Sequence, residues 1–145
     1  MKLATVSMFV AIASVYLTTV AFASPEKGIE IAIEADSRDE GFGDSTAQIT
    51  MILMDKYGQS TERAIRNSTF EGNNEGDKSL VIFDSPGDVR GTAFLSHTKK
   101  AGSDDQWLYL PSLKRVKRIA SSNRAGPFMG SEFSYEDIAS QEIEK

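Results

Sequence analysis

The segment Ser79-Leu80-Val81-Ile82-Phe83-Asp84 decides the fold class of this chain. Its four central residues are apolar without a break, mostly of the β-branched and aromatic types that strands favour, and a proline and a glycine follow closely. Trp107-Leu108-Tyr109-Leu110 repeats the pattern, and Ile52-Leu53-Met54 comes close to it. A sheet covered on one side only would alternate apolar and polar residues. We therefore expect apolar surroundings on both faces: a helix on one side and a core or ligand cavity on the other, or ordinary layers on both.

Further strands flank this segment. The chain after Gly43 consists of short β-type runs broken by glycine, asparagine and proline, with Tyr57-Gly58-Gln59-Ser60 as a hairpin turn. The predicted strands are Ala47 to Lys56, Thr61 to Phe70, Ser79 to Asp84, Gly91 to His97, Trp107 to Leu110 and Arg115 to Ser121. Six strands at this spacing predict an antiparallel meander that curls toward a barrel or half-barrel.

The segment Pro25 to Glu40 fits two patterns. Its isoleucines alternate as in a strand, but Ile29, Ala32 and Ile33 also share one face of a helix. The ends favour the helix, because Ser24 suits the N-cap, Pro25 the first helical position and Gly41 the stop. The fold class is therefore α+β, mostly antiparallel β.

Residues 1–23 have the order of a secretory signal peptide. Lys2 precedes an uncharged run from Leu3 to Val20, and Ala21-Phe22-Ala23 forms a small-x-small site. Cleavage between Ala23 and Ser24 would leave one mature domain of residues 24–145 outside the cytoplasm. The alternative is an uncleaved membrane anchor, since about 18 apolar residues just span a bilayer. The run includes Ser7, Ser14, Thr18 and Thr19, and no basic stop-transfer cluster follows it, which favours cleavage.

Composition excludes several function classes. The chain has no cysteine, which removes disulfides, thiolate metal sites and thiol catalysis. Its formal net charge is −5, and without Lys2 the mature part holds 15 basic and 21 acidic residues. An acidic protein of this kind is not expected to bind nucleic acid.

Four motifs follow one another in the second half of the chain. They are Phe83-Asp84-Ser85-Pro86-Gly87-Asp88-Val89-Arg90-Gly91-Thr92-Ala93-Phe94-Leu95, Asp104-Asp105-Gln106-Trp107-Leu108-Tyr109-Leu110-Pro111, Lys114-Arg115-Val116-Lys117-Arg118-Ile119 and Phe128-Met129-Gly130-Ser131-Glu132-Phe133-Ser134-Tyr135-Glu136-Asp137. As an ordered set, they resemble the LolA-like family of outer-membrane lipoprotein-sorting proteins, in the branch associated with RND-type exporters. The resemblance extends from Ile29 to Lys145.

This resemblance implies a periplasmic half-barrel of antiparallel strands with an N-terminal helix packed on the sheet. An apolar cavity would shield lipid or lipoprotein acyl chains in transit toward the outer membrane. Such proteins are usually near twice this length, so residues 24–145 are expected to form the N-terminal half of a longer domain and an incomplete half-barrel. An exposed sheet edge would then invite pairing with another chain.

Large apolar side chains in the predicted strands and in one loop are candidates for the wall of the cavity. They are Met51, Leu53, Phe83, Phe94, Trp107, Tyr109, Phe128 and Met129. Trp107 and Tyr109 share one strand face, where aromatic rings with polar tips suit a lipid-lined wall. Ordinary core packing is the alternative for all of them. The loop Gly126 to Ser131 either gates a cavity mouth or anchors Phe128 in the core.

A cluster of cations follows the fifth predicted strand: Lys114, Arg115, Lys117 and Arg118. These residues are candidates for transient contact with anionic headgroups, with an outer-membrane acceptor or with an RND-type exporter. The alternative is a solvated strand whose charges protect a sheet edge.

Catalysis lacks its usual parts in this sequence. The single histidine, His97, has no nucleophile motif near it, and no P-loop or dinucleotide fingerprint occurs. Asp104 and Asp105 are adjacent, so in a strand their carboxylates point to opposite faces. We expect no enzyme, no cofactor and no metal, and a lipid or lipoprotein carrier; an accessory protein of an RND-type exporter is the alternative.

Overall fold

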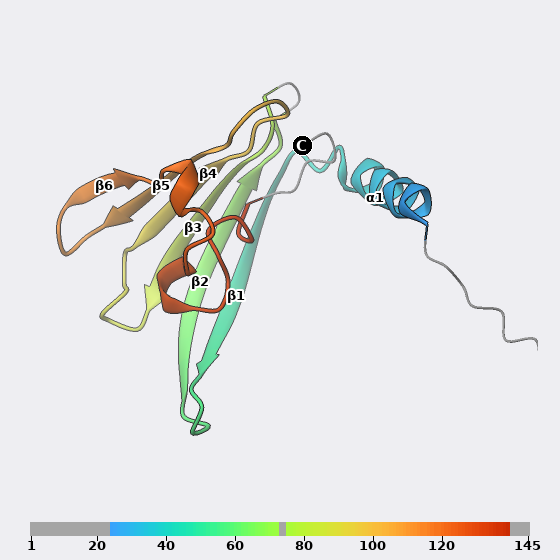
Figure 1. The fold of residues 1–145 in the computed structure, drawn as a ribbon. Coiled ribbons are helices and arrows are strands. Elements are labelled where there is room, and N and C mark those ends of the chain that lie inside the picture. Colours follow the sequence, from blue (N-terminus) through green and yellow to red (C-terminus); the bar gives the residue numbers. More distant parts are fainter. Residues whose placement is uncertain (1–23, 73–74, 140–145) are drawn as a thin grey trace, which may run out of the picture.

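The computed structural model describes residues 24–72 and 75–139, which form one helix followed by an antiparallel sheet (Figure 1). The predicted signal peptide, including Ala23 at its cleavage site, lies outside the described residues. Within the described ranges, no helix is both long enough and apolar enough to cross a membrane.

The helix α1 (Pro25–Asp39) begins and ends where its sequence signals lie. Ser24 has an extended backbone, and its Oγ accepts a hydrogen bond of 3.2 Å from the backbone N–H of Lys27. Pro25 occupies the first helical position, where its missing N–H costs no hydrogen bond. The helical interpretation of this segment is therefore confirmed.

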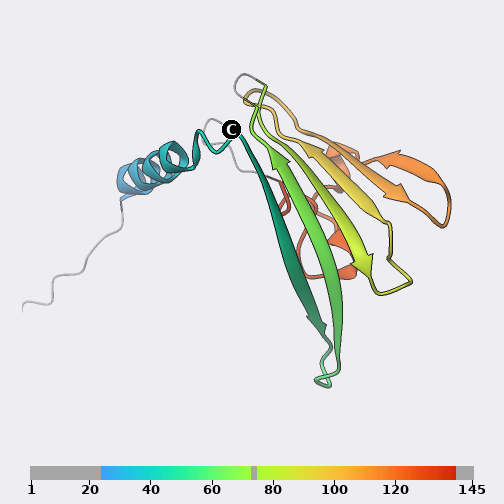
Figure 2. The ribbon, with the colours of Figure 1, turned by 180° about the vertical axis from the view of Figure 1, so that it is seen from behind.

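One detail of the prediction was wrong, because α1 does not pack on the sheet. No residue of α1 is buried, and Ile29 and Ile33 are each more than half exposed. Figures 1 and 2 both show the helix standing clear of the strands. The short linker between α1 and the first strand is held by the sheet. The N–H groups of Gly41 and Gly43 donate to the two carboxylate oxygens of Glu71 at 2.6 and 2.7 Å, and both glycines have positive φ.

The sheet is a six-stranded meander in sequence order, as predicted. Its strands are β1 (Asp44–Met54), β2 (Ser60–Phe70), β3 (Lys78–Ser85), β4 (Ala93–His97), β5 (Asp105–Leu110) and β6 (Arg115–Arg118). The hairpin between β1 and β2 closes with a 2.9 Å bond from the Asp55 N–H to the Gln59 carbonyl. β1 and β6 are the two edges, so the sheet is not closed.

One face of the sheet, here called the packed face, carries the hydrophobic core. Strand register places Ile65, Val81, Phe83, Phe94, Gln106 and Leu108 on this face, and all of them are buried. Residues 119–139, here called the covering segment, lie across it; they are in front of the sheet in Figure 1 and behind it in Figure 2. The side-chain amide of Gln106 donates to the carbonyl of Tyr135 at 2.9 Å, which ties the segment to β5.

The opposite face, here called the open face, carries apolar rows that no described element covers. Two rows of cross-strand neighbours cross it: Trp107, Leu95 and Leu80 in one, and Val116, Tyr109, Ala93 and Ile82 in the other. Leu80, Leu95 and Tyr109 are each more than one-third exposed. Both faces of the sheet thus carry apolar side chains, as predicted. Within the described chain, only the packed face is covered by another segment.

Candidate functional site

Three of the predicted lipid-contacting residues lie in the core of the packed face. Phe83 and Phe94 are fully buried, and Phe128 is 1% exposed. The Phe128 ring lies 5.9 Å from the Phe83 ring, 5.3 Å from the Phe94 ring and 5.4 Å from the Tyr135 ring. Because these aromatic rings fill the space between sheet and covering segment, a ligand can reach them only if that segment moves.

The loop from Gly126 to Ser131 holds Phe128 in place. The Phe128 N–H donates to the Phe133 carbonyl at 2.6 Å, and the Ser131 hydroxyl donates to the Phe128 carbonyl at 2.8 Å. Met129 follows with φ 51° and packs against the core. Of the two interpretations of this loop, the core anchor describes this structure.

Met51 and Leu53 lie elsewhere on the packed face, near the outer edge of the sheet. With Ile49 they form a row along β1, here called the β1 strip, since alternate residues of a strand share a face. Met51 touches the core, Leu53 is half-buried, and Ile49 is 45% exposed. The β1 strip therefore continues the apolar surface of the core into a region that the covering segment leaves accessible.

Arg63 is a residue of this site that sequence analysis missed. It lies on β2 directly opposite Met51, on the packed face, and is half-buried. Its guanidinium donates to the Met129 carbonyl at 2.7 Å and lies 5.9 Å from the centre of the Phe83 ring. The alternation of Arg63 with the buried Ile65 was the available signal, because it places a cation on the apolar face of β2.

Trp107 and Tyr109 share the open face, with Leu108 and Leu110 on the other side of β5, as their alternation predicts. Residues that pair in register on neighbouring strands share a face of the sheet. Followed from β5 to β1, this pairing places these two aromatic residues and the β1 strip on opposite faces. The eight predicted lipid contacts therefore do not line one common cavity. They divide among the core, the β1 strip and the open face.

Three of the four predicted cations lie in β6 and the fourth, Lys114, directly precedes it; all four are exposed. Lys114 is in the turn before the strand with φ 49°. Arg115 and Lys117 point to the same side as Leu108, whereas Arg118 pairs in register with Trp107 on the open-face side. They do not converge on a single point, and β6 is an edge strand.

The two adjacent aspartates both bind Lys99 but differ in their other partners, Arg124 for Asp104 and Arg118 for Asp105. The Asp104 carboxylate accepts from the Lys99 N–H at 2.9 Å, while the Asp105 carboxylate forms ion pairs with the Lys99 and Arg118 side chains. Hydrogen bonds from Lys99 and then Arg118 lower the pKa of Asp105 from 3.8 to about 2. Among the described residues, no group of three His, Asp or Glu side chains could hold a metal ion.

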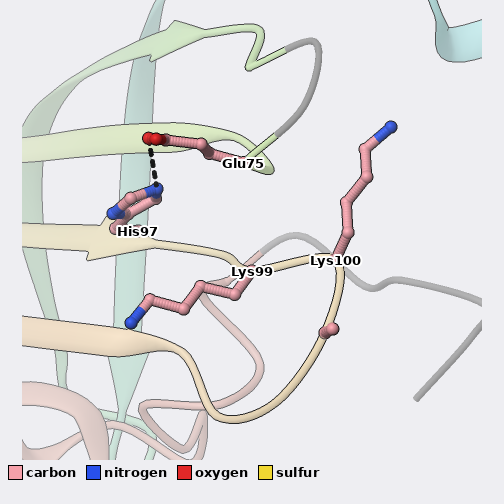
Figure 3. Close-up of a pocket in the computed structure, with 5 residues that line it drawn as sticks. Glu75, His97, Lys99 and Lys100 are labelled. Carbon is pink, nitrogen blue, oxygen red and sulfur yellow. Dashed lines mark ion pairs between the residues drawn. The ribbon is translucent and has the colours of Figure 1, made fainter.

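An open pocket of about 410 Å³ lies at the far end of β4, lined by Glu75, His97, Lys99, Lys100 and Ala101. Figure 3 shows His97 facing Glu75, with 4.0 Å between Nε2 and the carboxylate oxygen, while the Lys99 and Lys100 side chains point apart. Because its walls are charged tips and the two ammonium groups diverge, this pocket offers neither an apolar cavity nor a converging catalytic group.

Comparisons with known proteins agree with this fold. A protein-family model described as that of an uncharacterized protein matches residues 75–145. The search of curated proteins gave no match. A crystal structure from Vibrio parahaemolyticus, named as an outer-membrane lipoprotein-sorting protein domain, is 60% identical over 83% of this chain, with a TM-score of 0.78. A DUF1329 family protein from Desulfovibrio piger is 30% identical over 82%, with a TM-score of 0.74.

The match covers only part of each of these solved structures. The present chain corresponds to 51% of the length of either solved chain, so it spans about half of each. Within that half, both the sequence and the fold are similar. The resemblance to outer-membrane lipoprotein-sorting proteins is therefore confirmed in sequence and in fold.

Proposed function

We propose that this protein is a periplasmic carrier that binds the acyl chain of a lipid or lipoprotein and moves it toward the outer membrane without catalysing a reaction. The observation that carries the proposal is the β1 strip, an accessible row of large apolar residues on the same face as the core. Contiguous exposed apolar surface of this kind usually marks a binding site.

The chemistry of the β1 strip suits an acyl chain. Burial of each CH₂ group contributes about 0.8 kcal/mol, so a chain laid along Ile49, Met51 and Leu53 would be held by area rather than by a specific polar contact. Methionine has a flexible thioether that adapts to chains of different shape. The name of the Vibrio relative, a lipoprotein-sorting protein domain, supports the same class of cargo.

The remaining parts of the proposal concern location and partners. The signal-like residues 1–23 support export to the periplasm. The exposed cations Lys114, Arg115 and Lys117 would give transient contact with anionic headgroups or with an outer-membrane acceptor.

Native mass spectrometry of the exported protein, combined with lipid extraction, tests the carrier. We expect bound lipid, and we expect Leu53→Glu to weaken its retention about tenfold or more, because a charge would replace a side chain worth about 1.5–3 kcal/mol on burial. Ile52→Glu is the matched control, since Ile52 is 58% exposed on the opposite face of the same strand. A folded, lipid-free wild-type protein would contradict the proposal.

The open face favours a second candidate function, an accessory protein of an RND-type exporter. Exposed apolar rows that include Trp107 and Tyr109 suit a protein contact, because aromatic residues are enriched in the centres of interfaces. In this case Trp107→Asp would reduce efflux by the exporter while Leu53→Glu would not. Efflux that is unchanged by Trp107→Asp would exclude this candidate.

A further inference from the structure

Arg63 is a half-buried cation in apolar surroundings. Met51 lies opposite it on β1, Ile65 follows two residues later on the same face, and the Phe83 ring lies 5.9 Å from its guanidinium carbon. One guanidinium nitrogen donates to the Met129 carbonyl at 2.7 Å. The Nε atom is buried, and no residue in the described part of the chain accepts a hydrogen bond from it.

The charge of Arg63 is also not neutralised within the described chain. Among the described arginines only Arg63 and Arg124 are half-buried, and Arg124 lies 3.9 Å from the Asp104 carboxylate. Arg66, three residues along β2 on the other face, forms a two-bond pair with Asp84 at 2.7 and 3.0 Å. No ion pair within residues 24–72 and 75–139 includes Arg63, although it is more buried than Arg66.

A buried cation without a counter-charge is costly, and a buried donor without a partner adds to the cost. An anion bound at Arg63 would supply the missing counter-charge. The planar guanidinium group binds a carboxylate through two parallel N–H···O bonds, and such charge-assisted bonds are stronger than neutral ones. The isolated cation therefore matches a ligand with one negative charge.

The β1 strip defines what would be attached to this anion. Ile49 to Leu53 extends about 14 Å at 3.4 Å per residue, with Arg63 beside its middle residue, Met51. A single row of side chains on one strand offers room for one extended hydrocarbon chain. An apolar row next to one unpaired cation is complementary to a single-chain lipid with an anionic head.

We infer that the ligand of this face is a fatty acid, with its carboxylate on Arg63 and its hydrocarbon chain along the β1 strip. The inference rests on the proposed carrier function and deepens it, because it names the head group and the number of chains.

Titration calorimetry with the exported, delipidated full chain tests this assignment. The probes are dodecanoate, dodecanol, which has the same chain length without charge, and lysophosphatidylglycerol. Wild type is expected to bind dodecanoate about tenfold more tightly than dodecanol, the difference that charge-assisted hydrogen bonds contribute. Arg63→Met is expected to remove this difference, and Arg63→Lys to retain part of it.

Arg66→Met is the matched control, since Arg66 lies on the same strand but on the open-face side. It is expected to keep the wild-type preference. Equal binding of dodecanoate and dodecanol by wild type would overturn the inference and leave the carrier function intact. Binding of neither alkyl probe would overturn both. Tighter binding of lysophosphatidylglycerol than of dodecanoate, lost in Arg63→Met, would overturn the assignment of a carboxylate head.

Discussion

Asp105 connects the edge of the sheet to the loop before β5. Its carboxylate pairs with Lys99 and Arg118, which lower its pKa from 3.8 to about 2. A carboxyl whose pKa is lower in the folded state stabilises the fold above the unfolded pKa, and this contribution is lost as the pH falls through the folded pKa.

We therefore predict that Asp105→Asn lowers the free energy of unfolding at neutral pH, and that the difference from wild type disappears as the pH falls from 3.8 to below about 2. Urea unfolding at a series of pH values measures this difference. A difference that stays constant over the whole range would show that the two ion pairs do not stabilise the fold.

Phe128 connects the covering segment to the core, because its ring contacts rings from β3, β4 and Tyr135. Phe128→Ala is expected to cost about 3–5 kcal/mol of unfolding free energy, the usual loss for a buried phenylalanine. Phe133→Ala is the control, since Phe133 is 53% exposed, and a change within about 0.5 kcal/mol is expected. Equal effects in chemical denaturation would contradict the role of Phe128 as a core anchor.

Among the elements, the two edge strands differ sharply. β6 has four residues, three of them arginine or lysine, and short charged strands discourage pairing with another chain. β1 has eleven residues and contains neither arginine, lysine nor proline. At the two ends of β1, the backbone groups of Gly43 and Asp55 form hydrogen bonds with the β2 side. The backbone N–H and C=O groups of the odd-numbered residues of β1 therefore point to β2, and those of the even-numbered residues point away from the sheet.

We predict that the chain associates through the outer edge of β1 in a concentration-dependent manner. Thr50→Pro removes an outward N–H and should shift the association to higher concentration without loss of the fold. Ile49→Pro removes a hydrogen bond to β2 instead and should destabilise the sheet. Light scattering over a concentration series, together with circular dichroism, distinguishes the two variants. Unchanged association of Thr50→Pro would exclude this edge.

On the scale of the whole molecule, the helix and the sheet are separate. The helix α1 has fifteen residues and buries none of them, whereas β2 to β5 hold the core. A helix of this length without tertiary contacts is marginal in water. Hydrogen exchange is expected to be fast in α1 and slow in β3 and β4. Equal protection would mean that α1 packs against the sheet in solution.

The molecule also distributes its apolar surface over three places: the helix, the β1 strip and the open face. The match covers 51% of each solved relative, so this distribution describes a chain that spans about half of them. The β1 strip differs from the other two surfaces because it lies on the core side of the sheet beside Arg63, a cation that forms no ion pair with any described residue.

The sequence by itself determined the local structure of this protein. Ser24, Pro25 and Gly41 mark the ends of α1, and the predicted turn Tyr57-Gly58-Gln59-Ser60 overlaps the connection 55–59 between β1 and β2, with Ser60 already in β2. The alternation in Trp107-Leu108-Tyr109-Leu110 assigned each side chain correctly to one of two faces. These features follow from backbone preferences and from the two-residue period of strands, which act over a few residues.

Only the tertiary structure decided which face is packed and where the candidate residues meet. Strand register placed Met51 and Leu53 on the face opposite Trp107 and Tyr109, and the covering segment buried Phe128. Glu71 set the direction of α1 from thirty residues away. The contact of the Arg63 guanidinium with the Met129 carbonyl, 66 residues away, likewise depends on how the covering segment crosses the sheet. Such contacts join distant parts of the chain, so no local pattern of residues encodes them.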